Sequence, residues 1–463
     1  MNDSPRILPR SEHTLSRRNI DPDALKVLYR LKSHDYVAYL VGGGVRDLLL
    51  GRKPKDFDIG TSAHPQQVKK LFRNCFIIGR RFRLCHVRFG QKAVEVSTFR
   101  RLAEAEEGDT LIRRDNAFGT PEQDAFRRDF TVNALFYDIA SFSVIDYVDG
   151  LADLEARVIR TIGDPGVRLR EDPVRMLRAV AIASRLEFTI DRDTLEAIRS
   201  LRGEIVKSSP ARILEEFYKI LRQGAARRTF QSLHDSGLLA YLLPEADLAI
   251  AQGGEAFLGS LARLDEYRNA GNTAPEDLIN ALLLGTMLVP LGAPLRRPMP
   301  PRRASRFEAA EGGEDSAAEA PPPAEDTATE LKALREAEAE EPALANPPPA
   351  FSLPFARRDL DRLRLILLSQ RRLHEVHRAP GVKHLLAGRP YFRDALRWME
   401  IHGGLEGQEL VAYWKSLDLG DVQPPAALVA RESSAAGGEA GSELGLRRRR
   451  RRRRRPKPAG TTP

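Results

Sequence analysis

The chain has 463 residues, of which 42% are hydrophobic, so it is long enough for two or three domains with sizeable cores. Its net charge of +9 is unevenly spread, because residues 447–457 carry +10 and residues 307–341 carry −10. These segments cancel, so the rest of the chain is basic by itself and favours a polyanionic partner. Two cysteines exclude a disulfide framework, and without a long apolar run we expect neither a secretory signal nor a membrane span.

The first third of the chain changes repeatedly between helical and strand patterns. Apolar residues at helical spacing predict helices over residues 22–33, 45–50 and 64–74. Short apolar or alternating runs predict strands over residues 36–41, 56–59, 84–89 and 93–99. The strand at 56–59 is expected to be a buried edge strand. The mixture continues to about residue 160 and predicts an α+β head, with an α/β arrangement as the alternative.

Nearly all of the chain beyond residue 170 has a helical pattern. The predicted helices cover residues 173–186, 194–201, 211–222, 227–236, 276–290, 357–377 and 391–402. Residues 296–350 are rich in Pro, Ala and Glu, and residues 425–463 contain nine consecutive arginines. Such compositions bury too little apolar surface to fold, so we predict a disordered insert within an all-helical body and a disordered tail after it.

The segment VGGGVRDLLLGRKPKDFDIGT at residues 41–61 joins a glycine-rich turn to two carboxylates. Glycine lets a backbone come close to phosphate because it has no Cβ. Asp56 and Asp58 are two residues apart, so an extended strand directs both side chains to one face. Glu95 lies in the strand pattern AVEVSTF, where burial of an acid requires a partner. These acids predict a site for Mg²⁺ and a nucleoside triphosphate. The alternatives are an exposed strand or turn for Asp56 and Asp58, and an edge strand whose Glu95 faces water.

A second motif, RRDFTVNA at residues 127–134, combines arginine with hydrogen-bonding side chains. Arg127 suits a phosphate, while Asp129 and Asn133 suit ribose hydroxyls. The alternative is a basic turn that leads into a helix capped by Asp129 or Thr131.

A third motif, EDPVRMLR at residues 171–178, places Asp172 and Arg175 three residues apart. On a helix this pair can present an acceptor and a donor fork to a base edge. The alternative for Asp172 is that it caps a helix that begins at Pro173.

In this order the three motifs resemble those of the class II nucleotidyltransferases, the family of bacterial poly(A) polymerases and tRNA CCA-adding enzymes. The resemblance covers residues 12–245. It implies an α+β fold, in which a mixed-sheet nucleotidyltransferase head similar to that of DNA polymerase beta precedes an all-helical neck and body. It also implies site roles: Asp56, Asp58 and Glu95 as catalytic carboxylates, Asp56 and Asp58 as metal ligands, Gly42, Gly43 and Arg46 at the triphosphate, Arg127, Asp129 and Asn133 at the nucleotide, and Asp172 and Arg175 at the base.

The segment IIGRRFRLCHV at residues 77–87 looks like a signature of the poly(A) polymerase branch, and SQRR at 369–372 is similar to its arginine-containing C-terminal region. RNA contacts are therefore expected of the arginines in this segment and of those that begin the C-terminal run: Arg80, Arg81, Arg83, Arg447, Arg448, Arg449 and Arg450. The alternatives are a basic loop before a strand and a tail that only aids solubility.

The resemblance implies a cytoplasmic polynucleotide adenylyltransferase that transfers AMP from ATP to RNA 3′ ends and promotes RNA turnover. Two Mg²⁺ ions are the expected cofactors, although carboxylates also suit Mn²⁺. RNA-decay or RNA-chaperone proteins are further expected partners. The alternatives are a tRNA CCA-adding enzyme and an RNA-binding protein without activity. The expected boundaries are 22–165 for the head, 166–235 for the neck, 236–295 and 351–420 for the body, 296–350 for the insert and 425–463 for the tail.

Overall fold

The computed structural model describes residues 4–79, 83–101, 117–271, 274, 277–292, 353–377 and 380–417. The predicted insert and tail, and with them Arg80, Arg81 and Arg447 to Arg450, lie outside the described residues. The chain divides into two compact units, Met1–Arg364 and Leu365–Pro463, and each is described by itself.

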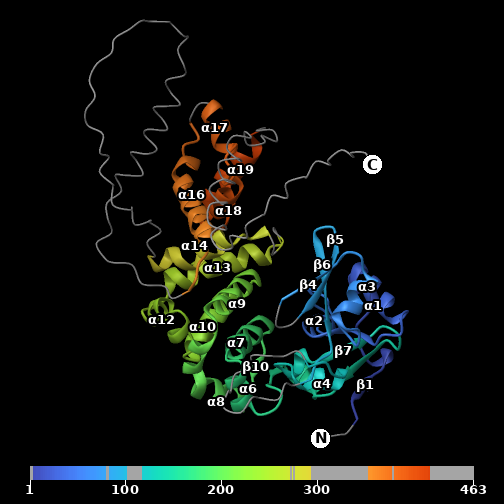
Figure 1. Cartoon of the computed structure of the whole chain (residues 1–463). Helices are drawn as coiled ribbons and strands as arrows, with labels where there is room; N and C mark the ends of the chain where they lie inside the picture. Colours follow the sequence, from blue (N-terminus) through green and yellow to red (C-terminus); the bar gives the residue numbers. More distant parts are fainter. Residues whose placement is uncertain are drawn as a thin grey trace, which may run out of the picture. The chain divides into compact units, whose positions relative to one another are not determined.

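A mixed sheet of eight strands forms the head of the first unit (Figure 1). Its strands are β1 Arg6–Leu8, β2 Ala38–Val41, β3 Asp58–Thr61, β4 Cys75–Ile78, β5 Leu84–Phe89, β6 Lys92–Thr98, β7 Leu135–Asp138 and β8 Ser143–Asp146. They lie in the order β1-β8-β7-β2-β3-β6-β5-β4. Neighbours are antiparallel except for β3 and β6, which are parallel. The sheet confirms the predicted mixed-sheet head.

Helices α1 Pro22–Lys32 and α3 Pro65–Leu71 pack on one face of this sheet. The carboxylate of Asp21 caps α1 by accepting hydrogen bonds from the N–H groups of Asp23 and Ala24, and proline follows it at the first helical position. Ala24, Val27, Leu28 and Leu31 are buried and recur at helical spacing. One face of α1 therefore covers the sheet, as its sequence pattern predicted.

Two predicted elements differ from the structure. The strand expected at 56–59 begins at Asp58, and it is a central strand between β2 and β6 instead of an edge strand. The helix considered after Thr131 is wrong: a 3-10 turn at Thr131–Asn133 leads into β7. Leu135, Phe136 and Tyr137 are all buried, as expected for a strand that is covered on both faces.

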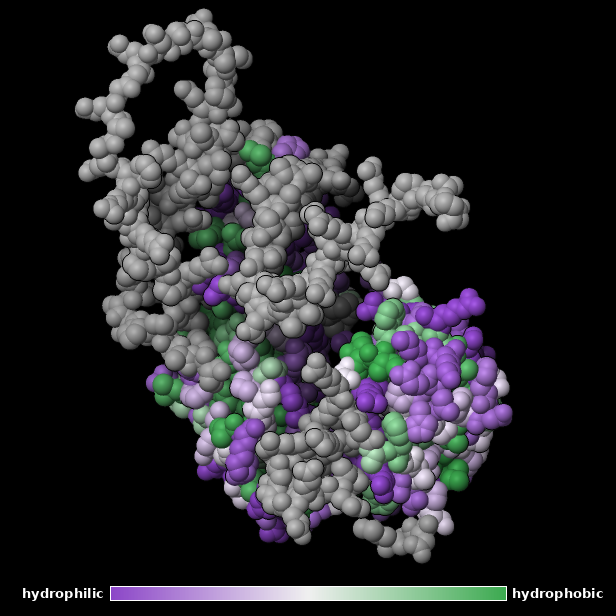
Figure 2. All heavy atoms as spheres, viewed as in Figure 1, coloured by the Kyte–Doolittle hydropathy of each residue, from purple (hydrophilic) through white to green (hydrophobic). Residues whose placement is uncertain are grey.

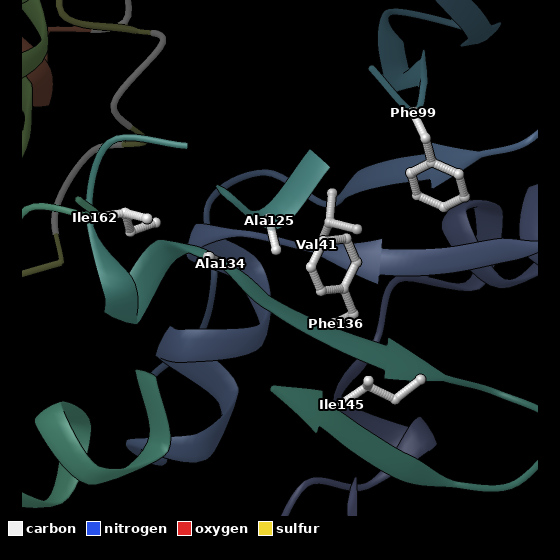
Figure 3. Packing of buried hydrophobic residues seen from close by; sticks show 7 residues of the cluster. All are labelled: Val41, Phe99, Ala125, Ala134, Phe136, Ile145 and Ile162. Atoms are coloured by element: carbon white, nitrogen blue, oxygen red, sulfur yellow. The ribbon is translucent and has the colours of Figure 1, made fainter. Parts of the chain in front are cut away.

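The core beside the glycine turn contains residues from segments that are distant in sequence. Figure 3 shows its buried members: Val41, Phe99, Ala125, Ala134, Phe136, Ile145 and Ile162. A Cβ added at Gly60 would lie 2.6 Å from a ring carbon of Phe99, so only glycine fits beside this ring. The core thus fixes β2, β3 and β7 next to one another, and the glycine turn follows β2 directly.

The rest of the described first unit is almost entirely helical, which confirms the predicted helical body. Two short strands, β9 Val158–Ile159 and β10 Thr189–Ile190, form a parallel pair. The helices that matter for the site are α2 Gly43–Leu49, α6 Pro165–Glu171, α7 Val174–Leu186, α9 Pro210–Arg222, α10 Ala226–Asp235 and α13 Glu255–Asn269. The other α-helices of this region are α4 Pro121–Phe126, α5 Gly150–Ala156, α8 Arg192–Leu201, α11 Leu239–Leu242, α12 Pro244–Ala251 and α14 Asn280–Leu288.

Helix α16, Arg357–Leu373, runs across the boundary of the two units, and α17 Pro380–Ala387, α18 Phe392–His402 and α19 Gly404–Ser416 follow in the second unit. There the Trp414 indole N–H donates to the carbonyl of Leu373 at 2.9 Å, and its ring lies 5.6 Å from that of Phe392. None of the helices in the described ranges has both the length and the apolar run needed to cross a bilayer.

Candidate active site

The glycine turn predicted from the sequence connects β2 to α2. Gly42 has φ of +74°, a conformation that favours glycine, and a Cβ there would lie 3.1 Å from Nη1 of Arg128. A Cβ on Gly44 would lie 3.3 Å from the carbonyl oxygen of Asp56. Because Gly42 and Gly44 have no side chains, Arg128 and the backbone of Asp56 can lie close to the start of α2. The first N–H groups of a helix lack partners within it, so this turn suits an anionic ligand such as a phosphate.

The three predicted carboxylates come together at the centre of the sheet. Asp58 begins β3, and Ile59 pairs in register with Val96, so Asp58 and Glu95 are neighbours on the same face of the parallel strands β3 and β6. Asp56 lies in the loop before β3 with its side chain 72% exposed, and Lys55 Nζ is 3.9 Å from its Oδ2. The proximity of Asp56 and Asp58 agrees with the prediction, although a single strand does not carry both.

The charges of this group are incompletely balanced. Burial, followed by the charges of Glu95 and Asp56, raises the pKa of Asp58 to about 7, although Arg128 opposes the change. Burial and the charge of Asp56 also raise the pKa of Glu95, against the opposing charges of Lys219 and Arg100. A divalent cation beside these acids would relieve their repulsion and favour their charged forms.

The donor set fits a metal that shares its coordination with a ligand. Within the described part of the chain, no group of three or more His, Cys, Asp or Glu side chains is assembled as a metal cage. Mg²⁺ is commonly bound through one or two carboxylates together with substrate phosphates and water. Asp56 and Asp58 provide this kind of partial site, beside a turn suited to phosphate.

Arg46 is buried behind the glycine turn, 4% exposed. Its Nε and Nη2 donate to Asp47 Oδ1 at 2.8 and 2.7 Å, and Nη1 donates to the side-chain oxygen of Asn133. Asn133 Nδ2 donates in turn to Asp129 Oδ1 at 3.1 Å. The guanidinium of Arg46 thus joins the glycine turn to the RRDFTVNA motif, and three of its nitrogens already have protein partners.

The two arginines of the second motif share one buried acid. Arg127 Nε donates to Asp124 Oδ1 at 3.0 Å, and Arg128 Nη2 donates to Asp124 Oδ2 at 2.9 Å. Arg128 Nη1 also donates to the carbonyl of Asn133 at 3.2 Å. Arg128 lies beside Gly42 and influences Asp58, so it is a site residue that the sequence analysis missed. Its position within the same motif was the available signal.

Asp129 is held in its charged form. Burial alone would raise its pKa, but the charge of Arg178 and a hydrogen bond from Asn133, assisted by Arg175, lower the pKa instead. Arg178 Nη2 lies 2.7 Å from Asp129 Oδ2, and its side chain remains 40% exposed. Arg178 was also missed, although it lies one helical turn beyond Arg175 on α7.

The predicted base-reading residues are engaged with other side chains. Asp172 accepts from Arg212 Nη1 and Nη2 at 3.0 and 2.8 Å. Arg175 Nη1 donates to the carbonyl of Arg168 at 2.8 Å and to Glu171 at 3.3 Å. The alternative that Asp172 caps the helix is wrong, because Pro173 holds the cap position and makes no side-chain cap bond.

A cavity of about 1270 Å³ unites most of these groups. The predicted residues that line it are Gly42, Gly43, Arg46, Asp56, Asp58, Asp129 and Asn133. Helices α7, α9, α10 and α13 contribute further walls, with more Arg and Lys than Asp and Glu over the whole lining. Glu95, Arg127, Asp172 and Arg175 do not line it. Arg83 lines a separate cavity of about 630 Å³ with His64 and Lys69.

A glycine turn and paired carboxylates at the centre of a mixed sheet line one basic cavity, in agreement with the nucleotidyltransferase head that the resemblance implied. The chain belongs to the tRNA nucleotidyltransferase/poly(A) polymerase family. Family models match three of its segments: the Poly A polymerase head domain at residues 38–160, the probable RNA and SrmB-binding site of polymerase A at 187–250, and the polymerase A arginine-rich C-terminus at 332–456.

The relatives come from both branches of the family. The chain is 50% identical to Poly(A) polymerase I of Salmonella typhi over 54% of this chain and 56% of that protein. It is 38% identical to the CCA-adding enzyme of Lactobacillus johnsonii over 46% of this chain and 54% of that protein. A crystal structure of the Bacillus stearothermophilus CCA-adding enzyme in complex with CTP is 26% identical, with 90% and 99% of the two chains covered and a TM-score of 0.45. The chain spans about half the length of the curated relatives it matches.

Proposed function

We propose that this chain is a template-independent RNA adenylyltransferase that adds AMP from ATP to RNA 3′ ends. The main supporting observation is the approach of the glycine turn to Asp56 and Asp58 within one basic cavity. The 3′-hydroxyl oxygen of RNA attacks the α-phosphorus of ATP and loses its proton to solvent. The new O–P bond joins AMP to the RNA, and the bond to the β-phosphate breaks to release pyrophosphate. This displacement requires alignment and charge stabilisation more than a protein nucleophile.

Each part of the site has a role in this proposal. Asp56 and Asp58 are the metal ligands, and Glu95 is the third acid beside them. When bound, two divalent ions, Mg²⁺ or Mn²⁺, would lower the pKa of the attacking hydroxyl and balance the charge of the leaving pyrophosphate. Gly43 presents its backbone N–H group to the triphosphate, as the start of α2 allows. Gly42, whose own N–H donates to the carbonyl of Leu135 at 3.1 Å, leaves room for the triphosphate because it has no side chain. Arg46 supports this turn from behind.

The nucleotide is held by groups that line the cavity and by groups outside its lining. Arg127 and Arg128 supply positive charge, and Asp129 and Asn133 offer hydrogen bonds to the ribose. Asp172 and Arg175 read the base, for which Asp172 must exchange Arg212 for the nucleotide and Arg175 must turn away from Glu171. Adenine selection therefore includes a change of side-chain partners in the neck.

The preference for ATP over a CCA-adding cycle is supported by the higher identity to poly(A) polymerases, 50% against 38%. We further propose the boundaries 22–165 for the head, 166–235 for the neck and 236–295 with 351–420 for the body. The proposed setting is cytoplasmic RNA turnover with RNA-decay or RNA-chaperone proteins as partners. Arg83 and the arginine-rich tail would then attract RNA by charge.

The test is incubation of the protein with an unstructured RNA, a divalent metal and each nucleoside triphosphate separately. A long ladder with ATP alone is expected. Addition that needs CTP, and that stops after three nucleotides when CTP and ATP are supplied together, would instead identify a CCA-adding enzyme. No extension, together with retained RNA binding, would identify an inactive RNA-binding protein. Asp58→Asn is the matched control and should abolish extension while RNA binding is retained.

A further inference from the structure

A single row of side chains connects the predicted catalytic acids to the edge of the sheet. Phe76 on β4 pairs in register with His86 on β5, and His86 pairs with Glu95 on β6. Asp58 follows on β3 through the parallel pairing of Ile59 with Val96. Directly paired residues on neighbouring strands point to the same face. The aromatic ring of Phe76 and the acids therefore share one face of the sheet.

This face is open at its edge, while the opposite face is covered. Cys75, Cys85, Val87 and Val94 point the other way and are buried, where α3 packs on β4 and β5 and α1 packs on β6. On the open face, Phe76 is 52% exposed and Ile78 is 43% exposed. Figure 2 shows an apolar patch on the head at the place where Figure 1 draws β4. An exposed aromatic side chain on an unpaired edge strand favours association with another molecule, so this patch suits a binding partner.

The surroundings of the ring suit single-stranded nucleic acid. The guanidinium carbon of Arg88 lies 5.0 Å from the centre of the Phe76 ring, so a cation and an aromatic surface adjoin each other. His86 Nε2 is 3.6 Å from Glu95 Oε2, next along the row toward the acids. Lys219 of α9 lies close enough to Glu95 for its positive charge to act to lower the pKa of the Glu95 carboxyl. Aromatic rings with flanking cations are the surfaces on which successive bases of a single strand stack.

We propose that Phe76, flanked by Arg88 and Ile78, is the stacking platform for a base near the 3′ end of the single-stranded RNA that the enzyme extends. This inference rests on the proposed function, because it places the RNA 3′-hydroxyl at the acids. Neighbouring strands are about 4.8 Å apart, so Phe76 is displaced by about 10 Å from Glu95 across two strand spacings. That separation suits a base one or two nucleotides before the reacting hydroxyl. The RNA then crosses the open face of β4, β5 and β6 toward Asp58.

The platform is tested with the full chain and a short oligoadenylate that carries the fluorescent base 2-aminopurine. The probe base stands either at the penultimate nucleotide or near the 5′ end, and binding is measured without ATP. Stacking on Phe76 should quench the penultimate probe and leave the 5′ probe much less affected. Phe76→Ala should abolish this quenching and weaken binding by about 5- to 150-fold, the loss of one stacked base. Phe76→Trp should restore both, while Phe76→Leu, which is apolar but not aromatic, should not.

Ile7→Ala provides the matched control, because Ile7 is 58% exposed on β1, at the opposite edge of the same sheet. This variant should leave the quenching of the penultimate probe and the affinity for the oligoadenylate unchanged. A thermal unfolding curve shows that each variant is folded. If Phe76→Ala retains the quenching, or Phe76→Leu behaves as the parent chain does, the platform is refuted and β4 has another occupant, such as a protein.

The two proposals can fail separately. A chain that forms ATP ladders but shows no dependence on Phe76 overturns only the platform. A chain with Phe76-dependent quenching but no extension with any nucleotide overturns only the adenylyltransferase function.

Discussion

Replacement of Asp58 by asparagine tests whether burial and the neighbouring acids penalise the charge of Asp58 when no metal is bound. The folded pKa of about 7 lies above the ordinary value of 3.8, so the folded chain holds this proton more tightly than the unfolded chain does. Between these values the stability must fall as the pH rises, and the full penalty is present above pH of about 7. A shift of this size corresponds to at most about 4 kcal/mol, since each pKa unit is about 1.4 kcal/mol.

Relaxation of the site reduces this figure, so we expect Asp58→Asn to stabilise the metal-free chain by about 2–4 kcal/mol at pH of about 8. The melting temperature should rise by about 2–4 °C per kcal/mol for a unit of this size, and the gain should vanish near pH of about 4. The assay is thermal unfolding in a chelator across this pH range. Asp56→Asn is the control and should have a smaller effect, because the Asp56 side chain is 72% exposed.

Added Mg²⁺ should raise the melting temperature of the parent chain above that of Asp58→Asn. The reason is that a cation bound by the acids stabilises the folded parent chain and not the variant. A stabilisation by Asp58→Asn that does not depend on pH, or a destabilisation at pH of about 8, would refute the penalty that burial and the neighbouring acids place on the charge of Asp58. An equal response of parent and variant to Mg²⁺ would refute Asp58 as a ligand.

Two further predictions concern the framework of the site. Gly60→Ala should destabilise the head by about 1–3 kcal/mol, because its Cβ would meet the buried ring of Phe99 at 2.6 Å. Gly259→Ala is the control: α13 there has only an Arg263 side-chain atom at 3.6 Å, so helix propensity should make it neutral or stabilising by up to about 1 kcal/mol. Asp47→Ala should cost about 3–5 kcal/mol in urea unfolding, because it removes the only carboxylate that the described residues place on the buried guanidinium of Arg46 and leaves it the neutral side chain of Asn133. A loss below about 1 kcal/mol for Asp47→Ala, or a Gly60→Ala variant as stable as the Gly259→Ala variant, would contradict these assignments.

Local sequence patterns predicted the parts of the site that depend on neighbouring residues. The glycine turn and the closeness of Asp56 to Asp58 followed from a short segment, and helices such as α1 followed from the spacing of apolar residues. The identity of side-chain partners did not follow, because they are far apart in the chain. Arg212 is 40 residues from Asp172, and Asn133 is 87 residues from Arg46. The strand β7 was missed because a run buried on both faces lacks the alternation that reveals a strand.

The parallel pairing of β3 with β6 has a consequence for how the acids of the site are brought together during folding. Parallel neighbours require a crossover, and here the intervening chain builds β4 and β5 before β6 returns beside β3. Contacts that close such long loops form late, after local helices and hairpins. Glu95 therefore reaches Asp58 only when half of the sheet is complete. A head that is only partly synthesised or partly folded therefore lacks the assembled acids and would not carry out the proposed nucleotide transfer.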